Sequence, residues 1–213
     1  MSRPRILGVF TFVAALFLSA IPVSVAGTAG GAEIAAADAV AASVNKVAPA
    51  EVDNPRMALA YEGATLKGSG ASSTVTVPTN STGIVTLASA GSGSARSLRV
   101  SLPRAARSEN AVVASDGTVT FGSKGAGTGV AIQAFQQGVR IQVILKSKAS
   151  ASAYTYVVNV PATGTIQPLA DGGLRVMGPN NALIGGFAAP WARDSNGVAV
   201  PTHDEIRSNT GCR

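Results

Sequence analysis

The residue types that most often carry out chemistry gather in one segment, Ala189 to Glu205, which reads APWARDSNGVAVPTHDE. It contains the only tryptophan and the only histidine of the chain, Trp191 and His203, and His203 is followed by Asp204 and Glu205. A histidine can act as the general base for a serine nucleophile, so a secreted hydrolase that uses His203 is one interpretation. In an extended segment Asp204 points to the opposite face from His203, so the orienting carboxylate would have to come from elsewhere.

The rest of the sequence has no pattern that indicates a serine nucleophile or any other catalytic or metal-binding partner for His203. The serine pattern Gly-x-Ser-x-Gly does not occur, and the acidic residues beyond Ser73 are few and stand mostly in predicted turns. A single cysteine, Cys212, and a single histidine cannot complete a tetrahedral zinc site. The glycine-rich stretch GSKGAGTG, residues 122–129, has predicted strands on both sides, whereas a phosphate-binding loop needs a helix after it. We therefore expect no enzyme, no catalytic residue, no cofactor and no metal site.

The first 26 residues have the three parts of a secretory signal. Arg3 and Arg5 precede an uncharged run from Ile6 to Ala26, and the run ends in Ser-Val-Ala, which predicts cleavage after Ala26. The alternative is an uncleaved anchor, because a membrane helix needs roughly 20 apolar residues and this run is about that long. With cleavage, the sequence predicts a secreted, extracellular protein that can associate with the cell envelope and has no stable membrane span.

Positive charge is concentrated between Lys67 and Lys148, where nine basic residues stand against only Glu109 and Asp116. Such a stretch could contact an anionic partner such as a cell-wall polymer, or it could be a solvated surface that like charge keeps soluble. The candidate contacts for an anionic partner are Arg96, Arg99, Arg104, Arg107, Arg140, Lys146 and Lys148. No aromatic residue interleaves with the four arginines, so specific nucleic-acid binding is not predicted, and another envelope protein is the remaining partner class.

Residues 27–72 are rich in alanine, glycine and serine and are predicted to be a linker or a short helix. Ala37, Val40, Val44 and Val47 fall on one narrow helical stripe, and Pro49 ends the pattern. These small side chains bury little area, so the sequence leaves two possibilities open: a helix that packs on a partner, and a loosely ordered stalk.

From Ser73 onward the pattern is that of short strands. Leu98, Val100 and Leu102 alternate with polar residues, and Asp116-Gly117 predicts a tight hairpin turn. The stretch GVAIQAFQQGVRIQVILK, residues 129–146, alternates apolar and polar residues on both sides of a turn. We therefore predict a mainly β domain over residues 73–207, built as an antiparallel sandwich or open barrel of short hairpins.

The segment that contains Trp191 fits the same scheme. Residues 183–188 are predicted to be a strand, Asp194 to Gly197 a turn, and Val198 to Val200 the start of a returning strand. Trp191 is then a packing anchor near the end of the sheet, and His203 has no assigned role.

Several of these phrases together resemble a family of exported actinobacterial proteins with a β-rich domain. They are STVTVPTNSTGI (73–84), SLRVSLP (97–103), ASDGTVTF (114–121), GVAIQAFQQGVRIQVIL (129–145), YTYVVNVP (154–161) and APWARDSNGVAVPTH (189–203). A similar β-rich region stands ahead of the repeats in some polymorphic toxins of the RHS and YD-repeat type. The most specific part of the resemblance runs from Pro190 to Thr202, and it implies no activity, ligand or site residue.

The chain departs from this family near its end. Family members typically have an aromatic residue where Asp204 stands and continue through another apolar strand, so residues 208–213 are predicted to be an aberrant or truncated C-terminus. Taken together, the sequence predicts a noncatalytic β-rich interaction or structural module at or outside the cell envelope.

Overall fold

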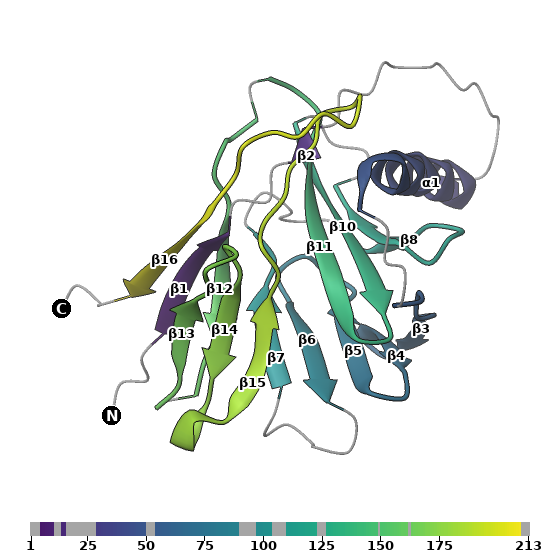
Figure 1. The fold of residues 1–213 in the computed structure, drawn as a ribbon. Coiled ribbons are helices and arrows are strands. Elements are labelled where there is room, and N and C mark those ends of the chain that lie inside the picture. Colours follow the sequence, from purple (N-terminus) through teal and green to yellow (C-terminus); the bar gives the residue numbers. More distant parts are fainter. Residues whose placement is uncertain are drawn as a thin grey trace.

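The computed structural model describes residues 5–10, 14–15, 29–49, 54–89, 97–103, 110–122, 127–148, 150–161 and 163–209 (Figure 1). These residues form one long helix and three β-sheets, so the fold is mainly β, as predicted. The described strands form open sheets and no closed barrel. Within the described residues, no helix combines the length and the hydropathy that a membrane span requires.

The largest sheet has eight strands in the order β16-β1-β12-β7-β6-β5-β4-β3, and every neighbouring pair is antiparallel. Its strands are β1 (Arg5–Phe10), β3 (Ala60–Glu62), β4 (Thr65–Ser69), β5 (Ser73–Pro78), β6 (Ile84–Ser89), β7 (Ser97–Ser101), β12 (Thr155–Asn159) and β16 (Asp204–Asn209). The β domain was predicted to start at Ser73, but the sheet begins earlier in the sequence. All five residues of β4 pair with residues of β5.

The second sheet has the order β2-β11-β10-β9-β8. Its strands are β2 (Ala14–Ala15), β8 (Val112–Val113), β9 (Val119–Phe121), β10 (Thr128–Phe135) and β11 (Gly138–Leu145). The predicted hairpin of residues 129–146 is confirmed as β10 and β11, which pair from Thr128↔Leu145 to Phe135↔Gly138. The β8–β9 hairpin is confirmed as well, and Gly117 supplies its turn with a φ of +82°, which glycine adopts without strain.

The helix α1 (Ala29–Val47) covers one face of this second sheet (Figure 1). The predicted stripe is its buried side, and Val40, Val44 and Val47 pack against Ala131 of β10 and Ile144 of β11. The structure therefore favours the first of the two possibilities: a helix, whose partner is the chain's own sheet.

The third sheet consists of β13 (Thr165–Pro168), β14 (Leu174–Met177) and β15 (Leu183–Phe187), with a 3-10 turn at Pro179–Asn181 between the last two strands. Residues 188–203, called the strap below, then connect β15 to β16. Figure 1 shows the strap rising past β11 toward α1 and returning to β16, and Lys46 Nζ of the helix donates to the Ser195 carbonyl oxygen at 3.4 Å.

The main hydrophobic core lies between the eight-stranded and five-stranded sheets. It contains Leu66, Val75, Val85, Val100, Tyr156 and Val158 from the first sheet and Val119, Phe121, Ile132, Ile141 and Val143 from the second. Leu174 and Val176 of the third sheet join the same core. Of the predicted signal, the structure describes only β1 and β2, and residues 210–213 of the predicted aberrant end lie outside the described residues.

Candidate functional site

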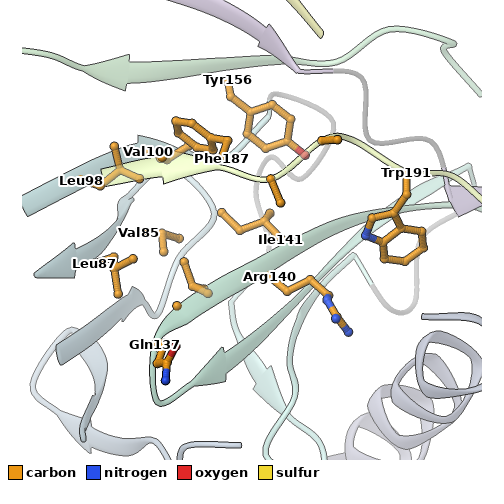
Figure 2. Close-up of a pocket in the computed structure, with 15 residues that line it drawn as sticks. Val85, Leu87, Leu98, Val100, Gln137, Arg140, Ile141, Tyr156, Phe187 and Trp191 are labelled. Carbon is orange, nitrogen blue, oxygen red and sulfur yellow. The ribbon is translucent and has the colours of Figure 1, made fainter. Parts of the chain in front are cut away.

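A pocket of about 290 Å³ opens where the three sheets meet. Its apolar wall is made by Val85 and Leu87 of β6, Leu98 and Val100 of β7, Ile141 of β11, Tyr156 of β12, Phe187 of β15 and Trp191 of the strap (Figure 2). This volume is close to the lower limit of small-molecule sites in proteins, which are also concave and mostly apolar.

The alternation of β7 explains how one strand lines the pocket and still faces solvent. Leu98 and Val100 are buried and point to the pocket, whereas Arg99 between them is exposed on the other face of the sheet. Across the pocket, Gly186 of β15 allows the close pairing with β14, because a Cβ atom there would lie 2.7 Å from the Leu174 carbonyl oxygen.

Arg140 of β11 supplies positive charge among the residues that line the pocket. Its Cζ atom lies 5.1 Å from the ring centre of Phe135 and 5.9 Å from that of Trp191, within the range of cation–π attraction. One Nη atom donates to the Pro49 carbonyl oxygen at 3.0 Å, just beyond the end of α1. Figure 2 shows Trp191 and Arg140 on the side of the view opposite Val85 and Leu87, with the Arg140 guanidinium pointing away from the apolar side chains.

Tyr156 lies at the inner wall and is 1% exposed. Burial raises the pKa of its phenol far above the usual range, and the neighbouring Tyr154 and Asp204 raise it further. The phenol therefore keeps its proton at any physiological pH and presents a neutral hydroxyl.

The predicted basic residues do not form one cluster in the described part of the chain. Arg96, Arg104 and Arg107 lie outside the described residues. Lys146 donates to the Gly122 carbonyl oxygen at 2.6 Å, and Lys148 is exposed beyond β11. Arg99 and Arg140 belong to different sheets, and only Arg140 belongs to the pocket.

The segment from Ala189 to Glu205 does not form one site, because Trp191, Asp194 and His203 lie in three different places. Trp191 lies half-buried at the pocket mouth. Asp194 forms the predicted turn, since its Oδ1 accepts from the amides of Asn196 and Val198 at 2.9 Å each. The returning strand is reduced to a single bridge between Arg193 and Ala199.

His203 is exposed at the end of the strap and lines a second pocket, of about 490 Å³, together with Asp171, Asp204 and Glu205. In the described part of the chain, no hydrogen bond joins its ring to a serine or to a carboxylate. Glu205 instead pairs with Arg207 at 2.8 Å, and the hydrogen bond and charge of Arg207 lower the pKa of the Glu205 carboxyl.

Most of the pocket residues were not singled out by the sequence. Leu98 and Ile141 each stand in a correctly predicted strand, but a strand pattern shows only which face is buried. Arg140 and Trp191 were named for other reasons, and the fold brings these two together.

Comparisons of the chain with protein-family models, with curated proteins and with solved structures return no match. The fold and the pocket define a β-sheet protein with an apolar pocket between its sheets. The resemblance to exported actinobacterial proteins stays a prediction.

Proposed function

We propose that this chain is a noncatalytic, exported β-rich binding module that acts at or outside the cell envelope. Its ligand is an amphiphile with an apolar body and one anionic group. The observation that carries the proposal is the apolar pocket between the three sheets, with Arg140 and Trp191 in contact with each other among the residues that line it.

The pocket separates apolar and charged surroundings along its length. Leu98, Val100 and Phe187 offer an apolar wall to a hydrocarbon chain, and burial of such a chain contributes roughly 25 cal/mol per Å² of apolar surface. Arg140, which is half-buried beside Trp191, places a permanent positive charge next to the apolar wall, and the proposal puts the anionic headgroup there. An amphiphile satisfies both ends at once, whereas a fully charged polymer would leave the apolar wall unused.

Export is supported by the signal-like N-terminus, with its basic start, apolar run and Ala-x-Ala-like exit. An extracellular β-rich module with such a pocket would meet amphiphiles released from the envelope. The sequence indicated an anionic partner such as a cell-wall polymer, and we propose a small anionic amphiphile that binds near Arg140 instead.

Titration with decanoate tests this proposal, because Trp191 is the only tryptophan and lies at the pocket mouth. We expect a saturable change in tryptophan emission, and we expect Arg140→Gln to weaken decanoate binding about tenfold. Arg99→Gln is the matched control, since Arg99 lies on the other face of the sheet. Decanol, which lacks the charge, should bind the wild type and Arg140→Gln equally well.

Filling the pocket gives an independent check. Leu98→Phe adds volume to the apolar wall and should reduce binding of both decanoate and decanol. If a folded Leu98→Phe variant binds decanoate with unchanged affinity, the ligand lies elsewhere and the proposal is wrong.

A further inference from the structure

The predicted signal segment takes part in two sheets of the fold. β1 pairs with β12 from Ile6↔Val158 to Val9↔Thr155 and with β16 from Arg5↔Asn209 to Phe10↔Asp204. β2 pairs with Ile144 and Leu145 of β11. Figure 1 shows β1 between β12 and β16, and β2 beside the end of β11. One short stretch therefore forms an inner strand of one main sheet and an edge strand of the other.

The pairing of the neighbouring strands shows what depends on β1. In the described part of the chain, β16 pairs with no strand other than β1. β12 has one other neighbour, β7, through Val158↔Val100 and Asn159↔Arg99. Cleavage after Ala26 would remove β1 and leave a row of unpaired backbone groups on β12, which is a template for another strand.

We infer that the place held by β1 is a strand-docking site, which takes an extended apolar strand from another polypeptide once the N-terminal segment has been removed. The inference rests on the export and cleavage that belong to the proposed function. Backbone hydrogen bonds from the incoming strand to β12 and β16 would provide the affinity, as in other cases of strand addition.

The register defines the chemistry of the incoming strand. Gly8 pairs with Tyr156 and Ile6 pairs with Val158, and both Tyr156 and Val158 are buried on the core side of the sheet. Residues directly opposite each other share a face of an antiparallel sheet. The strand therefore needs a small residue opposite Tyr156 and an apolar residue opposite Val158, and it runs antiparallel to both neighbours.

The two-sided geometry favours a single strand over a second copy of this chain. β12 and β16 are both antiparallel to β1, so they border a slot one strand wide. Ile206 of β16 packs against the main core, so β16 keeps a contact beside this slot, and the edge of a second folded sheet would meet β16 before it reached β12. A single extended strand has no such obstacle.

The test uses the full chain with a specific protease site introduced between Ala15 and Ala29, so that the protein folds before it is cut. After cleavage and removal of the N-terminal fragment, a fluorescent peptide with the sequence of residues 3–12, RPRILGVFTF, is added. We expect saturable binding to the cleaved protein and none to the uncleaved protein. The same peptide with Gly8→Pro should bind at least about tenfold more weakly, because proline removes a backbone donor.

The Val157 amide donates to Ser101 Oγ on the β7 side at 2.9 Å, so the second readout is hydrogen exchange at its two neighbours, Tyr156 and Val158. Their protection should fall after the fragment is removed and return with the peptide. If cleavage unfolds the whole protein, the peptide should restore protection in β10 and β11 as well, and failure to do so overturns the inference.

Three other results would also overturn it: equal binding of both peptides, a cleaved dimer that excludes the peptide, or undiminished protection of β12 without the peptide. Decanoate titration of the uncleaved protein and N-terminal sequencing of the exported product test the proposed function separately. The two ideas can therefore fail independently.

Discussion

The two faces of the β10–β11 hairpin are closed in different ways. On the outer face α1 lies across the strands, and its stripe packs on Ala131 and Ile144. On the inner face Ile141 and Val143 meet the other main sheet, and a pocket remains at the end where β15 and the strap complete the wall. One helix thus packs against the outer face of the strand pair, whereas on the inner face parts of all three sheets line a pocket that stays open.

Polar contacts fix the helix on the outer face. Asp38 accepts from the Ser115 amide and hydroxyl at 2.6 and 3.0 Å. Asn45 donates to Asp116 Oδ2 at 2.8 Å, and the same carboxylate oxygen lies 2.7 Å from Arg56. The β8–β9 turn thus bonds to the helix at two points, which sets the position of α1 along the sheet.

The largest effect is expected from a charge beneath the helix. Val44 is 2% exposed, and Val44→Asp would place an unpaired carboxylate against Ile144, which should cost about 3–5 kcal/mol of the free energy of unfolding. Ala42→Asp, on the exposed side of the same helix, is the control and should cost no more than about 0.7 kcal/mol. Urea unfolding measures both. Equal losses would mean that α1 does not pack on this face.

An intermediate effect is expected from the polar contacts. Burial alone raises the pKa of the Asp116 carboxyl, but hydrogen bonds from Asn45 and Thr118 and the charge of Arg56 outweigh it, so the net pKa lies below the ordinary 3.8. A lowered pKa means that the ionised carboxylate stabilises the fold above pH 3.8, and that this contribution disappears as the pH falls through the folded-state pKa.

Asp116→Asn should therefore cost about 1 kcal/mol at pH 7, a value kept low because a third of the side chain is exposed and solvent screens it. The difference from the wild type should shrink as the pH is lowered below 3.8. Glu62→Gln, which affects only the exposed pair with Lys67, is the control at each pH. A difference that does not change with pH would show that the charge of Asp116 contributes nothing.

The strands could be predicted because their signal is local. Alternation over residues 129–146 and the Asp116-Gly117 turn define hairpins whose partners are adjacent in the sequence. β4 was missed because Leu66 is its only large apolar residue, so no period of two is visible. The sequence could not decide whether α1 packs on a sheet, because its contacts are not local. The Ser115 amide that donates to Asp38 is 77 residues away in the sequence, and only the fold brings the two residues together.

The candidate site could be predicted only in part. Arg99 and Arg140 both stand between apolar residues on strands, and the sequence cannot tell one from the other. In the fold, Arg99 is exposed to solvent, whereas Arg140 is half-buried and contacts Pro49 and Trp191. A pocket built from several distant strands has no local pattern, so its apolar wall could not be foreseen.

The smallest effect concerns Arg140, the residue that joins the two faces. Its guanidinium bonds to Pro49 beyond the helix and lies over Trp191 at the pocket mouth. In a double-mutant cycle, Arg140→Gln and Trp191→Phe should be coupled by about 0.5 kcal/mol, which is typical of a partly exposed cation–π pair. Thermal or urea unfolding of the four proteins measures the coupling, and Arg99→Gln with Trp191→Phe should show none. Zero coupling in the first cycle would mean that the contact between Arg140 and Trp191 does not contribute to stability. Arg140 would then not link the helix side of the hairpin to the pocket.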